Sequence, residues 1–204
     1  AYDLFLHQGT VPQGLPQRLL LPTSHERIKL LPANTALATL ERQSPGQSGL
    51  GLVIAKSLAQ LWGEFDHAVI DSPPLLGILM VNALAASQQL VIPVQTEFLA
   101  VKGLERMVST LAMINRSRKQ ALPYLIVPTL FDRRTQASMS TLRALRNSYP
   151  EQLWPAYIPV DTRLRDASRA GLTPSQFDPN CRAVLAYRAL LKHLLSLQPT
   201  AQVA

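Results

Sequence analysis

The sequence has one cysteine and no long apolar run. Cys181 has no second thiol in the chain to pair with, which excludes an internal disulfide and fits a reducing cytosol. No apolar stretch approaches the ~20 residues that a membrane-spanning helix needs. The first nine residues lack a basic segment followed by an apolar one, so they predict no secretion signal. A chain of 204 residues that is 47% hydrophobic is expected to form one soluble domain, residues 1–204, with a substantial core.

Glycine is also scarce, with nine residues in the chain. A loop that cradles phosphate needs glycines between a strand and a helix, with an adjacent Lys-Ser or Lys-Thr pair. The best candidate, residues 46–51 (GQSGLG), follows Ser44-Pro45 rather than a buried strand and lacks that pair. Lys56 lies inside the helix expected to follow, on its polar side. Residues 46–51 are therefore not expected to bind phosphate.

The net charge of +7 lies in the second half of the chain. Residues 1–101 hold five Lys/Arg against seven Asp/Glu, a balance of −2, and residues 102–204 hold fifteen against six, a balance of +9. A basic field on one side of a protein favours a polyanionic partner, either nucleic acid or an anionic membrane surface. The alternative is a solvated surface rich in arginine.

One acidic residue, Asp71, follows a short apolar run. Residues 68–70 (AVI) predict a strand buried on both faces, which the proline pair at 73–74 ends. Asp71 is then expected at the carboxyl end of this strand, where open α/β sheets bind their ligands. A carboxylate there needs a cation or hydrogen-bond donors, and Mg²⁺ beside a nucleotide phosphate supplies the first. The alternative is that Asp71 caps the following turn or helix.

The remaining apolar patterns alternate between strands and helices. Strands are expected at residues 27–31, 68–71, 90–94, 121–130 and 153–158, and helices at 33–42, 50–62, 79–86, 101–115, 135–149, 162–169 and 181–197. Pro123 and Pro128 predict an edge or irregular position for the strand that contains them. The alternation predicts an α/β fold with a doubly wound, mostly parallel sheet.

Several segments resemble the ParA/MinD family of P-loop ATPases, and most closely the branch found with chemotaxis clusters. They are residues 29–34 (KLLPAN) with Glu41, 70–74 (IDSPP), 82–84 (NAL), 90–104 (LVIPVQTEFLAVKGL), 130–138 (LFDRRTQAS) and 157–171 (YIPVDTRLRDASRAG). The resemblance implies a P-loop NTPase fold. It also implies a phosphate loop upstream of residue 1, so the sequence is expected to be incomplete at its N-terminus. ATP hydrolysis would then belong to the complete protein.

The resemblance further implies a nucleotide site. Asp71 matches the Walker B carboxylate, which holds the magnesium shell indirectly, and Ser72, Pro73 and Pro74 would shape the loop after it. Two later segments border the adenine in the family, which assigns Thr129, Asp132, Pro159, Val160 and Asp161 to base binding. For these five residues, ordinary turn chemistry is the alternative.

The resemblance also implies nonspecific DNA binding. Arg134 and Arg163 match basic positions that contact DNA in the family, and Arg133 and Arg165 add charge nearby. Fixed positive charges contact phosphates without reading sequence. No zinc-finger or helix-turn-helix pattern accompanies them. A solvated basic face is the alternative.

The function implied is a cytoplasmic ATPase, associated with the nucleoid or a cell pole. It would bind ATP and Mg²⁺, dimerise with itself and position a plasmid, a chromosome or a chemotaxis array through a ParB-like or array adaptor protein. Two alternatives remain open: a non-catalytic short form that binds partners, and a MinD-like ATPase on a membrane. A membrane partner is not expected, because the basic amphipathic helix at 181–197 is apolar over more than one stripe, which favours core packing.

Overall fold

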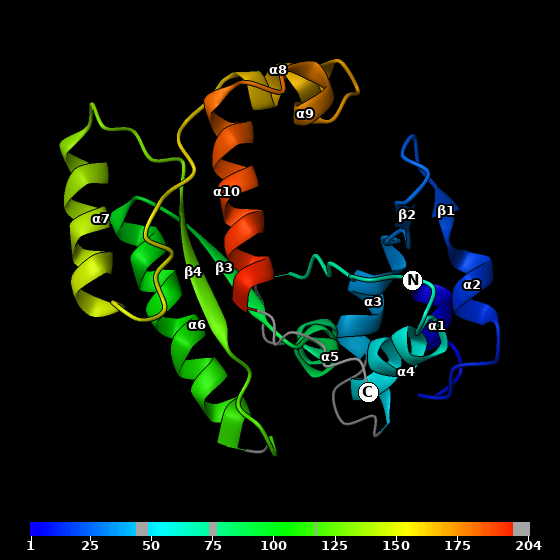
Figure 1. Ribbon diagram of the computed structural model, residues 1–204. Coiled ribbons are helices and arrows are strands. Elements are labelled where there is room, and N and C mark those ends of the chain that lie inside the picture. The colour runs from blue at the N-terminus through cyan, green and yellow to red at the C-terminus, as the bar shows by residue number, and fades with distance from the viewer. Residues whose placement is uncertain (44–48, 74–76, 117, 198–204) are drawn as a thin grey trace. The chain divides into compact units, whose positions relative to one another are not determined.

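The computed structural model describes residues 1–43, 49–73, 77–116 and 118–197 (Figure 1). These residues form two compact units, Ala1–Gln88 and Gln89–Ala204. The expected α/β class is confirmed, because helices alternate with a parallel pair of strands in the second unit. No helix among the described residues has the length and apolar character needed to cross a bilayer.

The first unit is mostly helical. Its elements are α1 (Tyr2–Phe5), α2 (Leu15–Leu19), β1 (Leu21–Pro22), β2 (Lys29–Leu30), α3 (Ala36–Gln43), the 3₁₀ helix η1 (Leu50–Leu52), α4 (Val53–Gln60) and α5 (Ile78–Ala86). β1 and β2 pair antiparallel. The core of the unit forms around Leu4, Phe5, Leu50 and Val53, which are almost fully buried. The helices expected at 33–42, 50–62 and 79–86 are thus present, with shifted ends.

Asn82 on α5 joins three parts of this unit. Its side chain is fully buried and accepts a hydrogen bond from the N–H of Ile54 at 3.1 Å. Its amide nitrogen donates to the carbonyls of Leu50 at 2.7 Å and Ile78 at 2.8 Å. A buried amide is stable only with such partners, so Asn82 fixes α5 against η1 and α4.

The second unit contains the parallel strands. Its elements are β3 (Leu90–Gln95), α6 (Phe98–Arg116), β4 (Tyr124–Thr129), α7 (Gln136–Ser148), α8 (Arg163–Arg169), α9 (Pro174–Phe177) and α10 (Arg182–Leu197). β3 and β4 pair in register, with Leu90 beside Tyr124 and Gln95 beside Thr129. Figure 1 shows α6 and α7 on one side of this pair and α10 on the other.

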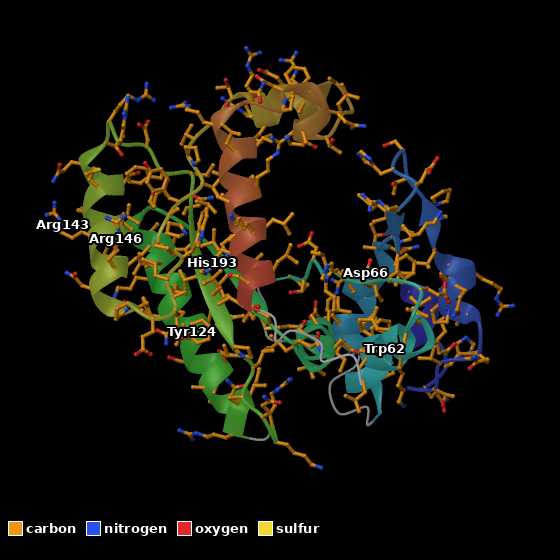
Figure 2. The ribbon with its side chains drawn as sticks, in the orientation of Figure 1. Trp62, Asp66, Tyr124, Arg143, Arg146 and His193 are labelled. Atoms are coloured by element: carbon orange, nitrogen blue, oxygen red, sulfur yellow. The ribbon has the colours of Figure 1, made fainter. Side chains whose placement is uncertain are left out.

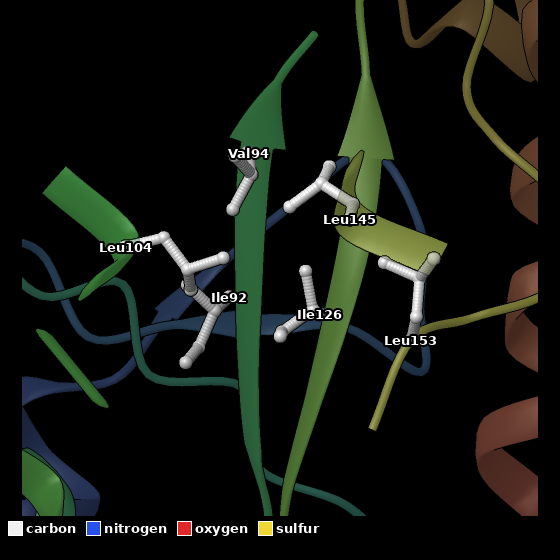
Figure 3. Close-up of a cluster of buried hydrophobic side chains, with 6 residues drawn as sticks. All are labelled: Ile92, Val94, Leu104, Ile126, Leu145 and Leu153. Atoms are coloured by element: carbon white, nitrogen blue, oxygen red, sulfur yellow. The ribbon is translucent and has the colours of Figure 1, made fainter. Parts of the chain in front are cut away.

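Alternate residues of β4 enter two different cores. Ile126 packs into a cluster on the α6 and α7 side (Figure 3). The members of that cluster are Ile92, Val94, Leu104, Ile126, Leu145 and Leu153. Leu125 and Val127 point to the opposite face, into a cluster with Leu190 of α10. Successive strand side chains alternate between faces, so a strand covered on both sides reads as a continuous apolar run.

Pro128 explains why one side of β4 is irregularly paired. Ile126 donates to Gln152 O and accepts from Trp154 N, both at 2.8 Å. Pro128 faces the same way but has no N–H, and only its carbonyl is used, by Ile158 N at 2.8 Å. The segment 153–159 therefore meets β4 and Phe131 through single bridges instead of a full ladder. The irregular position expected for this strand is confirmed.

The buried strand predicted at residues 68–71 is wrong in this structure. These residues have no regular secondary structure and lie in no ladder, and the side chain of Val69 is 97% exposed. A strand forms only where neighbouring strands bond its backbone and other elements cover its side chains. No such strand flanks residues 68–71 among the parts of the chain that the structure describes.

Candidate functional site

Polar residues gather where β3 and β4 end in the second unit. Thr96 directly follows β3, and its N–H donates to Thr129 O at 3.1 Å. Its buried hydroxyl lies 3.0 Å from Ser138 Oγ, near the start of α7. Leu130 adopts φ +50°, a left-handed backbone that is strained for a branched side chain. The carboxyl ends of both strands thus form a polar, conformationally constrained edge, the place where open α/β sheets bind ligands.

The two segments expected to border a base lie side by side. Phe131 N donates to Ile158 O at 3.1 Å, and Val160 N donates back to Phe131 O at 3.0 Å. Phe131 and Pro159 form a parallel bridge, and the rings of Phe131 and Tyr157 lie 4.1 Å apart. The structure therefore brings the segment of Thr129 and Asp132 beside the segment of Pro159, Val160 and Asp161.

Asp132 forms a closed ion pair with Arg134. Nε of Arg134 donates to the two carboxylate oxygens at 3.0 and 3.2 Å, and Nη2 donates at 2.7 Å. The backbone N–H of Arg134 also donates to Asp132 at 3.0 Å. These bonds from Arg134 lower the pKa of the Asp132 carboxyl to about 2. Arg134 therefore presents its remaining N–H groups to solvent, with 80% of its side chain exposed.

Asp161 plays a similar part before α8. Its carboxylate accepts from the N–H of Arg163 at 3.1 Å and from the N–H of Ala183, in α10, at 3.1 Å. Burial alone would raise the pKa of this carboxyl, but the two backbone donors, the charge of Arg182 and the Cys181 thiol together lower the pKa. Asp161 thus ties the start of α8 to the start of α10.

The two arginines expected to contact DNA share one local arrangement. Arg134 and Arg163 each stand two residues after an aspartate that accepts their backbone N–H. This Asx turn is ordinary turn chemistry, the alternative open for both aspartates. Arg163 also lies 3.6 Å from Asp178, so each arginine has an acidic partner. Arg133 and Arg165 are exposed.

Arg182 lies beside the polar edge, a position that sequence patterns did not predict. Its guanidinium lies 3.4 Å from the carbonyl of Val160, and its charge lowers the pKa of both Asp132 and Asp161. The sequence places it only as the first residue of a basic helix. Arg182 and Asp132 are fifty residues apart in the chain, so no local sequence pattern indicates that they lie close enough to interact.

Asp71, Ser72 and Pro73 lie in the other unit. Asp71 is exposed, and its carboxylate makes no hydrogen bond or ion pair within the described residues. One free carboxylate fits Mg²⁺, which keeps several waters and takes one or two protein carboxylates plus phosphate. The described residues contain no group of three or more acidic, histidine or cysteine side chains that could hold a metal by itself. Pro74 lies outside the described residues.

The glycine-rich stretch and Lys56 serve packing in the parts described. Residues 46–48 lie outside the described residues, and the backbone of Gly49 packs so closely on Gly9 that no Cβ fits between them. Lys56 Nζ donates to the carbonyl of Gly9 at 2.6 Å. This lysine is therefore engaged with the first unit's own backbone.

A separate cavity lies at the opposite end of β4. It has a volume of about 480 Å³, and its lining includes Tyr124, Glu151 and His193; Figure 2 labels Tyr124 and His193. Burial, and then the nearby Tyr149, raise the pKa of the Tyr124 hydroxyl. The cavity adjoins the start of β4, away from the polar edge formed at its end.

Comparison with known proteins decides the family. Residues 8–124, more than half of the chain, match a family described as an AAA domain. The chain is 28% identical over 180 residues to the chromosome partitioning protein ParA of Myxococcus xanthus, covering 88% of this chain and 64% of that protein. It belongs to the ParA/MinD family. The second relative, the sporulation initiation inhibitor protein Soj of Bacillus subtilis, is 27% identical over 95% of this chain and 75% of its own length.

A solved structure of a further relative agrees with this ParA/MinD membership. Cobyrinic acid a,c-diamide synthase from Mycobacterium smegmatis, crystallised with an ATP analog and magnesium, superposes with a TM-score of 0.70 at 30% identity. The match covers 90% of this chain and 69% of that one. Nucleotide and magnesium thus occur in a structural relative of the chain. The fold expected from sequence, that of a P-loop NTPase, is confirmed by this match.

Proposed function

We propose that these 204 residues belong to a ParA-type ATPase that positions or partitions intracellular cargo through an ATP-dependent dimer. The observation that carries the proposal is the similarity to ParA and Soj along 88% and 95% of the chain. The chain spans less than two thirds of the Myxococcus protein, so the activity is proposed for the complete protein. Residues 1–204 would form a single ATPase domain of it.

Asp71 is the proposed magnesium-shell residue. Its exposed and unpaired carboxylate is available to the waters around Mg²⁺, and Ser72 and Pro73 would set the course of the loop that carries it. The ion, when bound, would neutralise charge that develops on the transferred phosphoryl group. Asp71 itself would orient one or more of the waters that the ion holds.

The polar edge of the second unit is the proposed contact for adenine. A planar base needs a few short polar or backbone groups and an apolar wall. Thr129, Asp132, Pro159, Val160 and Asp161 supply such groups on two segments that hydrogen-bond to each other. The carboxylates of Asp132 and Asp161 are already bonded within the chain, so they would border the base without being its main donors or acceptors.

DNA is the proposed surface on which the dimer acts. Arg134, Arg163, Arg133 and Arg165 are exposed cations on neighbouring turns, and the second half of the chain carries the net positive charge. A ParB-like protein or a chemotaxis-array adaptor would stimulate hydrolysis and release the dimer. The protein would then work in the cytoplasm, on the nucleoid or at a pole.

The test uses the complete reading frame that encodes these residues. Its mass in solution is measured with ATP and Mg²⁺, with ADP and Mg²⁺, and with ATP and a chelator. The mass is expected to double with ATP and Mg²⁺ and to stay that of the monomer under the other two conditions. The same mass under all three conditions would contradict the dimer switch and support the alternative, a non-catalytic protein that binds partners.

The role of Asp71 has a matched control in Asp66. Both carboxylates are exposed and lie five residues apart in the segment after α4; Figure 2 labels Asp66. Asp71→Asn is expected to lower ATP turnover on the order of 100-fold, because the metal shell loses its charged partner. Asp66→Asn removes the same charge and is expected to change turnover less than about twofold. Equal effects of the two substitutions would remove Asp71 from the site.

A further inference from the structure

The outer face of α7 carries cations that no other described residue neutralises. α7 contains Arg143 and Arg146 and no Asp or Glu at any of its thirteen positions. Both arginines are exposed and form no ion pair or hydrogen bond with other described residues; Figure 2 shows them on α7. Arg134, by contrast, is held by Asp132 just before the helix begins. The charge of α7 is thus available to an external partner.

The same face holds other unused donors at helical spacing. Gln136, Arg143 and Asn147 recur seven and four residues apart, so they lie on one side of the helix. The side chains of Gln136 and Asn147 are exposed and have no hydrogen-bond partner among the described residues. Amide and guanidinium groups are the usual donors to phosphate oxygens. The two side-chain amides and the two arginines, none of which has a partner among the described residues, could therefore donate hydrogen bonds to successive phosphates.

The shape of the face allows close approach. Its other exposed members are Ala137, Met139, Ser140 and Ala144, of which only Met139 is large. From Gln136 to Asn147 the helix rises about 17 Å, which equals roughly five base-pair steps along the axis of a duplex. The buried side, with Leu142 and Leu145, anchors the helix on β3 and β4, so the donors stand on a rigid support.

We infer that Arg143 and Arg146, with Gln136 and Asn147, form a sequence-independent contact for the phosphate backbone of nucleic acid. A lipid surface fits less well, because a helix lying on a membrane needs an apolar face. Met139 is the one large apolar side chain exposed on α7, all of which the structure describes. This inference rests on the proposed function only for the identity of the polyanion as DNA, and it adds a contact helix that the family resemblance did not assign.

The test measures binding of the complete protein, with ATP and Mg²⁺, to a labelled duplex of random sequence as KCl is varied. In the variant Arg143→Gln/Arg146→Gln, the slope of log K against log salt is expected to fall by about two, with affinity lowered on the order of ten- to a hundredfold near 0.1 M salt. The variant Arg143→Lys/Arg146→Lys keeps both charges and is expected to retain the slope. Circular dichroism checks that each variant folds.

A matched control removes two charges elsewhere. Arg188→Gln/Lys192→Gln acts on α10, another helix without acidic residues, where the exposed cations alternate with exposed leucines. A slope change below about 0.5 is expected. If the α10 variant lost as much affinity as the α7 variant, the effect would be one of total charge and the inference would be overturned.

The remaining outcomes separate the inference from the proposed function. A wild-type complete protein that, with ATP and Mg²⁺, binds no duplex at low salt would overturn both. Binding that disappears in Arg134→Gln/Arg163→Gln but not in the α7 variant would keep the DNA proposal and overturn the role of α7. If the variant Arg143→Gln/Arg146→Gln lost binding to phosphatidylserine vesicles but kept duplex binding, nucleic acid would be overturned as the partner of this face.

Discussion

Arg134 forms a bidentate ion pair with Asp132. Its Nε and Nη2 both donate to the carboxylate, and the shortest distance, from Nη2 to Oδ2, is 2.7 Å. The pair lies at the polar edge beyond β4, where Asp132 has been assigned to a base and Arg134 to DNA by resemblance. The contact joins the two assignments physically, because neither side chain can move without changing the other. It also gives a direct way to test the local geometry.

The first prediction concerns the titration of Asp132. In the wild-type chain its carboxyl carbon, followed by NMR, is expected to titrate near the pKa of about 2. In Arg134→Gln the pKa is expected to rise toward the ordinary value of 3.8, since the main stabiliser of the carboxylate is gone. The folded pKa lies below the unfolded one, so the pair stabilises the fold above about pH 4 and that effect is lost as pH falls toward 2. A wild-type carboxyl that titrates near 3.8 would contradict the ion pair.

The second prediction follows from the charge that Asp132 cancels. Asp132→Asn leaves Arg134 unpaired, so binding of the chain to a random duplex is expected to tighten and the salt slope to steepen by about one. Glu151→Gln removes one negative charge from the opposite end of β4 and serves as the control, with a smaller expected change. Weaker binding by Asp132→Asn would mean instead that the carboxylate positions the arginine for contact.

The polar edge was only partly predictable from sequence. The positions of Thr129 and Pro159 after apolar runs were enough to place two segments at strand ends, because a buried strand reads as a continuous apolar run. The Asx turns before Arg134 and Arg163 have a local signal, Asp two residues ahead of Arg. The approach of Arg182 to Asp132 has none, since it depends on how α10 packs against β4.

Strand prediction succeeded and failed for one physical reason. Residues 90–95 and 124–129 are apolar and become strands because they pair with each other. Residues 68–70 are equally apolar, yet a strand also needs partners on either side, and local composition does not specify them. Asn82 shows the converse case, since a polar residue in an apolar helix gives no sign of the three backbone groups that it satisfies.

The third prediction tests Asn82 as a structural residue. Asn82→Ala leaves the N–H of Ile54 and the carbonyl of Leu50 buried without their partner, so the free energy of unfolding is expected to fall by about 2–4 kcal/mol. Urea unfolding followed by circular dichroism measures this change. Asn147→Ala, at an exposed position of α7, is the control and is expected to stay within about 0.5 kcal/mol. A similarly small effect at Asn82 would show that water or other groups replace its bonds.

The last prediction compares the two apolar runs. Ile126 is fully buried between α6, α7 and the strands, so Ile126→Ala is expected to lower the free energy of unfolding of the second unit by about 2–5 kcal/mol. The fluorescence of Trp154 reports that loss, since its backbone N–H donates to Ile126 O at 2.8 Å and its ring is buried. Val69→Ala removes a side chain that is 97% exposed and is expected to change stability by less than about 0.5 kcal/mol. If Val69→Ala instead cost as much as Ile126→Ala, residues 68–71 would be a buried strand in solution, as their composition predicts, and Asp71 would again stand at the end of a strand.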